Sequence, residues 1–138
     1  MACAASEPSN QTLFSGAGGV RLSAVDMLIF AKAVLDPNSP IAAAVETSLP
    51  ARLPRGSSVD QAFGWEVTHH SLFRELLLHE GQTHGYRATL ALKPAKGRAT
   101  VVLINSAAEP SAIDLGLHLA LGTGVWPVAP YPRAPPRR

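Results

Sequence analysis

Two apolar segments joined by a proline–glycine turn dominate the second half of the chain. Residues Tyr86 to Lys93 alternate a more apolar face with a more polar one, as a strand covered on one side does. Thr100 to Ile104 (TVVLI) is apolar throughout, which is typical of a strand buried on both faces. Because proline and glycine in Pro94 to Gly97 favour chain reversal, we predict an antiparallel hairpin.

Shorter upstream segments extend this hairpin into a sheet. Glu75 to His79 (ELLLH) is an apolar run suited to a strand, and Trp65 to His69 is a short alternating segment. The stretch from Leu49 to Gln61 is rich in proline, glycine and serine, and is predicted to be a loop. We therefore expect an antiparallel sheet of three to four strands flanked by helices.

The first helix is marked by a capping box. Ser23 followed three residues later by Asp26 predicts a helix that begins at Ser23, and Pro37 ends it. The apolar residues between them fall on one helical stripe: Met27, Phe30, Ala31, Val34 and Leu35.

Two further helices are predicted. One covers Ile41 to about Ser48, with Ser39 as its cap and Pro40 in its first position. The other runs from Ser111 to Gly122 and opens with a capping box formed with Asp114. Helices and antiparallel strands in this order indicate an α+β fold.

The 138 residues are expected to form one domain with loose ends. Residues 1–12 are small and polar and are predicted to be a lead-in, while residues 13–122 carry all the predicted elements. Residues 123–138 hold five of the chain's twelve prolines, which favours an extended tail. This tail is either an ordinary terminus or a recognition motif.

Charge and cysteine content narrow the classes of partner. The net charge is +2, and three of the twelve basic residues lie in the tail, so no basic stripe is available for nucleic acid. Cys3 is the single cysteine, which excludes an intrachain disulfide and cysteine-rich zinc sites. We expect no cofactor.

No run of about 18 apolar residues and no export signal are recognised, so we expect no membrane segment, and the compartment is left open.

One segment carries a resemblance to a known family. HEGQTHGYRATLALKPAKGRATVVLINSA, residues 79–107, resembles the third signature of the penicillin-recognising serine hydrolases, a Lys-Thr-Gly or His-x-Gly triplet on the strand lining the active site. Residues 16–36 are similar to the glycine turn and helix that precede this signature in class C β-lactamase, esterase and D-alanyl-D-alanine carboxypeptidase-like members. FGWEV, residues 63–67, is similar to the Gly-Trp strand between them. The resemblance covers residues 13–121.

The resemblance implies roles for four consecutive residues. His79 takes the place of the lysine or histidine that faces the substrate, and Glu80 stands where many members have threonine. Gly81 allows close backbone approach, and the backbone N–H of Gln82 is implied to be one of two oxyanion-hole donors. The glutamate puts ordinary binding of a substrate carboxylate in doubt.

The residues of the nucleophilic step do not occur in this sequence. No serine is followed three residues later by lysine, so the Ser-x-x-Lys signature is missing, and neither tyrosine begins a Tyr-x-Asn. We therefore expect a C-terminal fragment of a β-lactamase-related hydrolase from a bacterial family whose members are often periplasmic or secreted. It is expected to be inactive alone and to bind an acyl or β-lactam-like small molecule when complemented by an N-terminal part. Self-association through an exposed sheet face is also expected.

Two alternatives remain open. The first is a non-catalytic interaction module on the same sheet. The second is a small metal-dependent hydrolase, suggested by His79, Glu80 and His84, although the two histidines are five residues apart and a zincin motif needs four. Adjacent His69 and His70, and His118 in the last predicted helix, are interpreted as surface histidines.

Overall fold

The computed structural model describes residues 16–50, 53–55, 59–68, 76–83, 85–106 and 111–122, the first four residues of the last range by their backbone alone. The predicted lead-in, residues 1–12, and the predicted tail, residues 123–138, lie outside these ranges. The elements, in chain order, are α1 (Ala24–Leu35), α2 (Ala42–Ser48), β1 (Leu53–Pro54), β2 (Val59–Gln61), β3 (Glu66–Thr68), β4 (Leu76–Thr83), β5 (Tyr86–Lys93), the 3₁₀ turn η1 (Pro94–Lys96), β6 (Arg98–Ile104) and α3 (Ser111–Leu121).

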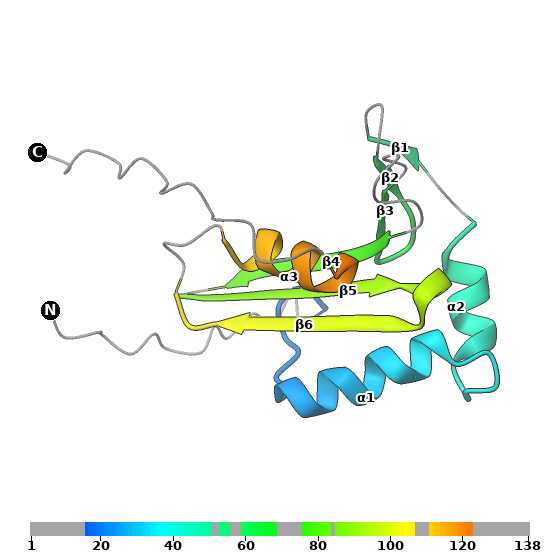
Figure 1. Ribbon diagram of the computed structural model, residues 1–138, viewed down its shortest axis with the longest axis horizontal. Coiled ribbons are helices and arrows are strands. Elements are labelled where there is room, and N and C mark those ends of the chain that lie inside the picture. Colours follow the sequence, from blue (N-terminus) through cyan, green and yellow to red (C-terminus); the bar gives the residue numbers. More distant parts are fainter. Residues whose placement is uncertain are drawn as a thin grey trace, which may run out of the picture.

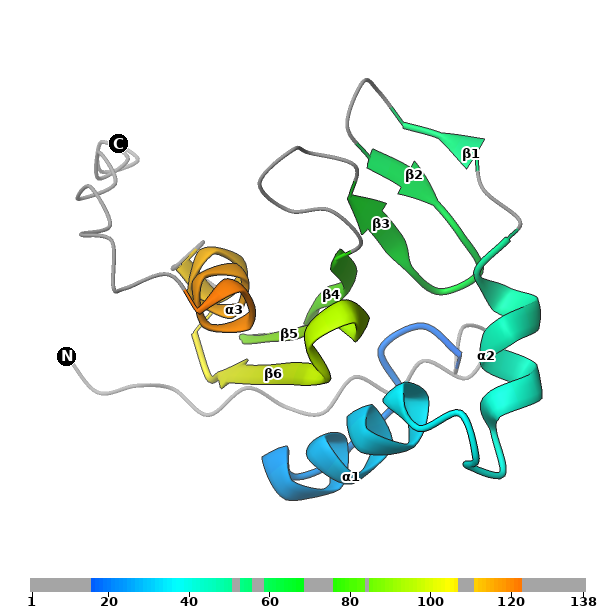
Figure 2. The same ribbon diagram turned by 45° about the vertical axis from the view of Figure 1, so that its right-hand side comes forward.

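The strands form one antiparallel sheet in sequence order, from β1 to β6. Helices α1 and α3 both contact β5 and β6, and Figure 1 shows them on opposite sides of these long strands. Figure 2 shows that β1, β2 and β3 turn away from the long strands, on the side where α2 lies. The predicted α+β class is confirmed.

The predicted strand count was too low, because the described residues alone form a sheet of six strands. Strands β1 and β2 lie in the segment predicted to be a loop, and they contain two and three residues. Segments this short cannot display an alternating pattern, and Pro54 in β1 suggests a break rather than a strand. These two segments are strands because β1 pairs with β2 and β2 pairs with β3.

The β5–β6 hairpin is confirmed. Its register runs from Lys93 opposite Arg98 to Arg87 opposite Ile104. Gly97 has φ +56°, a left-handed conformation that closes the turn after Pro94–Lys96 and that glycine adopts without strain.

Strand β4 is longer than predicted. The sequence predicted a strand that ends at His79, but pairing with β5 continues to Thr83 opposite Tyr86. Gly85, directly before β5, has φ +91°, a left-handed conformation that glycine adopts without strain. The apolar run stops at Leu78, which made the strand seem shorter, but backbone pairing with β5 does not need apolar side chains.

Helix α1 begins as predicted. The Ser23 hydroxyl accepts from the Asp26 N–H at 3.2 Å, and Asp26 Oδ2 accepts from the Ser23 N–H at 3.1 Å. The helix ends at Leu35, with Asp36 as its C-cap directly before Pro37.

The predicted start of α2 was wrong. Ile41 is at the N-cap and makes no side-chain capping bond. Ser39, the predicted cap, instead donates its hydroxyl to the Ala33 carbonyl at 2.6 Å, so it ties the connection back onto α1. Residue type alone cannot distinguish a serine hydroxyl that accepts from an N–H of α2 from one that donates to a carbonyl of α1.

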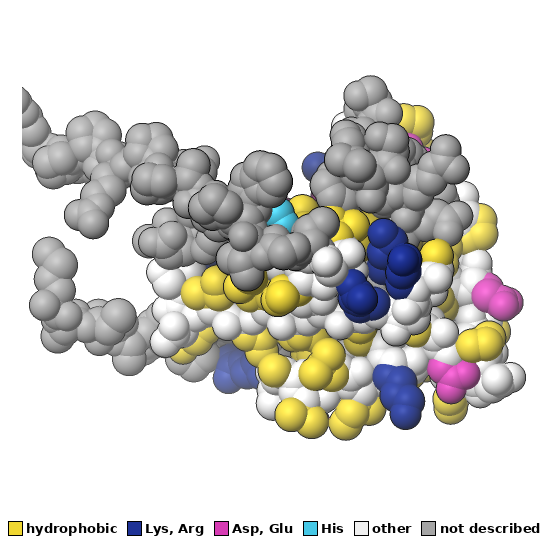
Figure 3. Space-filling model, in the orientation of Figure 1, with side chains coloured by type: hydrophobic (Ala, Val, Ile, Leu, Met, Phe, Trp, Pro, Cys, Tyr) yellow, Lys and Arg dark blue, Asp and Glu magenta, His cyan; other side chains and the backbone are white. Residues whose placement is uncertain are grey.

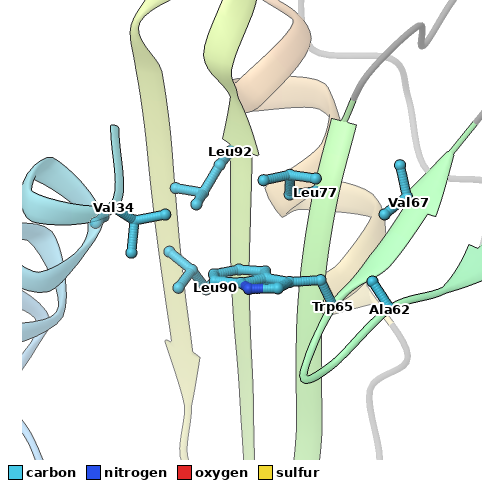
Figure 4. Packing of buried hydrophobic residues seen from close by; sticks show 8 residues of the cluster. Val34, Ala62, Trp65, Val67, Leu77, Leu90 and Leu92 are labelled. Carbon is cyan, nitrogen blue, oxygen red and sulfur yellow. The ribbon is translucent and has the colours of Figure 1, made fainter. Parts of the chain in front are cut away.

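The sheet has an apolar cluster on each face. On the α1 side, side chains from α1, the β2–β3 turn and the long strands pack together, as Figure 4 shows for Val34, Trp65 and Leu90. On the other side, Leu76 and Leu78 pack with Ala91 and with Ala120 of α3. Within the described ranges no helix is long and apolar enough to cross a membrane.

Candidate functional site

Strand β4 extends beyond its neighbour β3. The pairing with β3 covers Leu76 to Leu78, whereas the pairing with β5 continues to Thr83. Among the described residues, His79–Thr83 therefore has a strand partner on one side only, and we call this segment the β4 edge. An unpaired edge presents backbone N–H and C=O groups that an extended ligand can bind.

All four residues predicted for the site lie on the β4 edge, and all four are exposed. Alternation along the strand directs them to different faces. Leu77 packs on the α1 side, and His79 follows it there, whereas Leu78 packs beneath α3, and Glu80 and Gln82 follow that side. The structure thus brings the four residues together along one strand, with the His79 side chain on one face and the Glu80 and Gln82 side chains on the other.

His79 is oriented by a backbone carbonyl. Its Nδ1 lies 2.7 Å from the carbonyl oxygen of Gly64. Because a carbonyl oxygen can only accept, this bond requires the proton on Nδ1, which leaves Nε2 as the acceptor in the neutral ring. The ring also meets Trp65 edge-on, with centroids 6.4 Å apart and planes at 75°. The imidazole is therefore fixed in both tautomer and orientation.

The carbonyl that orients His79 comes from a rigid turn between β2 and β3. Gly64 has φ +75°, and the Ala62 N–H donates to the Trp65 carbonyl at 2.8 Å across the turn. The Gln61 side-chain amide donates to the same Trp65 carbonyl at 3.0 Å. Trp65 itself is buried in the sheet cluster, so this turn is anchored to the core.

A small hollow lies where the β2–β3 turn meets β4. Its volume is about 170 Å³, and its lining includes Gln61, Gly64, Glu66, Leu78, His79 and Glu80. Drug-sized ligands occupy pockets of roughly 300–1,000 Å³, so this hollow can hold one group of a ligand whose remainder lies along the β4 edge.

The α3 side of the hollow carries two carboxylates. Partial desolvation raises the pKa of Glu80, and the nearby Glu66 carboxylate raises it further, while Arg87, His79 and Arg55 act in the opposite direction. Glu66 is paired with Arg55 Nη1 at 2.5 Å, and the same Nη1 donates to Gln61 Oε1 at 3.0 Å. This surface disfavours a ligand carboxylate beside Glu80.

The comparison with protein families decides the lineage. The family model described as Beta-lactamase matches residues 2–123 of the chain. This chain belongs to the beta-lactamase family. The predicted membership in the penicillin-recognising serine hydrolases is thereby confirmed. No curated protein and no solved structure matches the chain.

Sequence reasoning did not find the residues that position His79 in this member of the beta-lactamase family. FGWEV was noted only as part of the resemblance, and no role was assigned to Gly64, Trp65 or Glu66. The sequence contained the Gly64–Trp65 pair, but nothing in it indicated that the Gly64 carbonyl would meet His79.

The histidines suggested as metal ligands are not assembled among the described residues. In the ranges that the structure covers, no three His, Cys, Asp or Glu side chains are grouped so that they could hold a metal ion. His84, His69 and His70 lie outside those ranges. His118 lies in α3 and is half-buried.

Proposed function

We propose that this chain supplies the substrate-side wall of an acyl-transfer site of the beta-lactamase family. The observation that carries the proposal is the exposed β4 edge, which among the described residues has a strand partner on one side only, beside a histidine whose ring is oriented by Gly64. An acyl or peptide-like ligand would lie along this edge as an added strand. His79 Nε2 would accept a hydrogen bond from it, and the Gln82 N–H would face the carbonyl oxygen.

The chemistry that this wall serves requires a nucleophile. In acyl transfer a serine Oγ forms a bond to the carbonyl carbon, its proton passes to a base, and the leaving group departs with a proton returned to it. A backbone N–H directed at the carbonyl oxygen lowers the barrier by roughly 3 kcal/mol in comparable sites. Neither Ser-x-x-Lys nor Tyr-x-Asn occurs in this sequence, so we propose that a separate segment carrying them completes the site.

Hydrolysis by the chain alone tests the catalytic part. Nitrocefin and p-nitrophenyl esters are expected to show no turnover above buffer. The same assay is repeated after adding a purified N-terminal segment of a family member that contains Ser-x-x-Lys. Turnover by the chain alone that a serine-directed acylating agent abolishes would refute the proposed division of labour.

Ligand binding tests the wall itself. Titration with an N-acylated dipeptide, followed by amide chemical shifts, is expected to perturb His79–Thr83. The matched control is β6, the long strand at the other side of β5, whose amides should move less. Equal perturbation of both strands, or none of either, would contradict the proposed site.

A second candidate function is a non-catalytic interaction module. It is favoured by the same β4 edge, which can bind a partner's extended peptide with no reaction. Complementation separates the two, because a module would gain no hydrolytic activity when the Ser-x-x-Lys segment is added.

A further inference from the structure

The β2–β3 turn fixes the direction in which the backbone groups of β3 point. The Ala62 N–H donates to the Trp65 carbonyl at 2.8 Å, so the backbone groups of Trp65 face β2. Because backbone groups alternate in direction along an antiparallel strand, the N–H and C=O groups of Glu66 face β4. Leu78 lies opposite Glu66, so its own N–H and C=O groups face β3.

The same alternation along β4 determines which backbone groups of the β4 edge are available to a ligand. Glu80 and Gln82 follow Leu78 by two and four residues, so their N–H and C=O groups point to the same side as those of Leu78. Beyond Leu78, no strand of the described residues lies on that side. Every pair of strands in this sheet is antiparallel, and a ligand strand added in the same way forms its hydrogen bonds with Glu80 and Gln82.

The β2–β3 turn limits the length of such a ligand strand. In the antiparallel direction its first residue pairs with Gln82 and its third residue pairs with Glu80. The next position would lie opposite His79, which is the position of Trp65, the residue directly before β3. The ligand strand therefore ends after its third residue, beside the turn.

The side chain of the third ligand residue lies on the α3 side of the sheet. Residues that lie directly opposite each other in an antiparallel pair project to the same face. Leu78 packs beneath α3, so Glu80, two residues later, projects to that side, and so does Glu66 opposite Leu78. All three residues line the hollow of about 170 Å³. The third side chain therefore enters the hollow over Leu78 and between two carboxylates.

The carboxylate of Glu80 has no hydrogen-bond or ion-pair partner in the part of the chain that the structure describes, whereas Glu66 is held by Arg55. Burial and the Glu66 carboxylate raise the pKa of Glu80, and they outweigh the opposite effect of Arg87, His79 and Arg55. The charged form of Glu80 is therefore the destabilised one. A cation placed beside it would stabilise this form.

We propose that Glu80 selects ligands with a cationic side chain, lysine or arginine, on the third residue of the strand that pairs with the β4 edge. The inference rests on the function proposed above, in which the attacked carbonyl faces the Gln82 N–H and so belongs to the first ligand residue. The cation then lies two residues beyond that carbonyl, on the side of the leaving group. An anionic third residue is disfavoured, because it meets both Glu66 and Glu80.

Titration of the full chain with three peptides, followed by amide chemical shifts, tests the selectivity. The probes are N-acetyl tripeptide amides that differ only in the third residue, which is lysine, norleucine or glutamate. Norleucine has the apolar stem of lysine without the charge. The lysine peptide is expected to bind about threefold tighter than the norleucine peptide, as a cross-strand charge pair in a partly solvated site does, and the glutamate peptide should bind most weakly.

Variants of Glu80 test whether this residue causes the preference. Glu80→Gln should bring the lysine and norleucine peptides to equal affinity, and Glu80→Lys should favour the glutamate peptide. The matched control is Glu46→Gln, which removes an exposed carboxylate from α2 and should leave the preference unchanged. Figure 3 shows acidic side chains at the end of the molecule where α2 lies, and in Figure 1 strand β4 runs away from this end. Circular dichroism verifies that each variant is folded.

A change of position tests the register. With lysine as the second residue, the side chain lies opposite Gly81 and projects to the α1 side, so this peptide should bind no tighter than its norleucine counterpart. Binding of the peptide with lysine as the third residue should also lower the pKa of Glu80, which the ¹³C shift of its carboxyl group reports.

Two kinds of failure are distinguishable. If all peptides perturb His79–Thr83 with equal affinity, the wall still binds ligands and the selectivity assigned to Glu80 is overturned. It is also overturned if the preference for lysine persists in Glu80→Gln, or if lysine is preferred equally as the second residue. If no peptide perturbs the β4 edge, the function proposed for the wall fails, and the selectivity fails with it.

Discussion

At the scale of single residues, the orientation of His79 depends on a backbone atom fifteen residues earlier in the chain. The bond to the Gly64 carbonyl selects the Nδ1–H tautomer, and Trp65 limits ring rotation. This contact could not be predicted from the sequence. The resemblance indicated that His79 faces a ligand, but nothing in the local pattern pairs it with a turn between two strands that were themselves too short to detect.

Gly64→Ala tests whether the β2–β3 turn determines the orientation of the His79 ring. At φ +75° an alanine is strained, so the variant should lose about 1–2 kcal/mol of unfolding free energy in urea. Relief of that strain would move the Gly64 carbonyl and change the ¹⁵N shifts of the His79 ring. Gly81→Ala is the matched control, because a Cβ there meets nothing within 4 Å and Gly81 has no positive φ. A Gly64→Ala variant as stable as Gly81→Ala would contradict the argument.

Glu80→Gln tests the carboxylate pair. Burial and Glu66 raise the pKa of Glu80 above its ordinary value of 4.5, so the folded chain binds more protons than the unfolded chain around this pH. Stability from this group is present at low pH and is lost as pH rises through the raised pKa. The variant should therefore gain about 0.5 kcal/mol or less relative to wild type at neutral pH, since solvent screens the site, and nothing near pH 3. A gain of equal size at both pH values would point to another cause.

At the scale of secondary structure, elements that carry their own local signal matched prediction. The α1 capping box and the β5–β6 turn are set by neighbouring residues, so their sequence was sufficient. Strands β1 and β2 exist through pairing with distant residues, and Ser39 bonds to Ala33 rather than capping α2. In each of these two cases tertiary contact determined the outcome.

Ser23→Ala tests the α1 cap. Loss of the hydroxyl leaves an N-terminal N–H unsatisfied and should cost about 1 kcal/mol at neutral pH. The hydrogen bonds from Ser23 lower the pKa of Asp26 below its ordinary value of 3.8, so their stabilisation is present above that value and is lost as pH falls through the lowered pKa. The difference between wild type and variant in urea melts should therefore shrink as the pH falls below 3.8, through the lowered pKa of Asp26. Ser48→Ala, which removes a hydroxyl bonded to Val45 within α2, is the control and should show no such change.

At the scale of the whole molecule, stability is expected to be concentrated in the long strands. Strand β5 is paired on both sides and lies between α1 and α3, whereas β1 consists of two exposed residues. Leu92 is fully buried in the α1-side cluster, so Leu92→Ala should cost about 2–5 kcal/mol of unfolding free energy. Leu53→Ala, at a site that is 72% exposed, should cost less than about 0.5 kcal/mol.

Hydrogen exchange provides the independent measurement of this distribution. Amides of Leu90–Leu92 should exchange only through global unfolding, and amides of β1 and β2 through local opening. Leu92→Ala should then accelerate the slowest amides by a factor that matches its loss of unfolding free energy, while Leu53→Ala leaves them unchanged. Equal protection of β1 and β5 would mean that the six strands unfold as one unit. In that case β3 could not open separately from the long strands. The β4 edge, which begins where the pairing of β4 with β3 ends, would then be as rigid as the core.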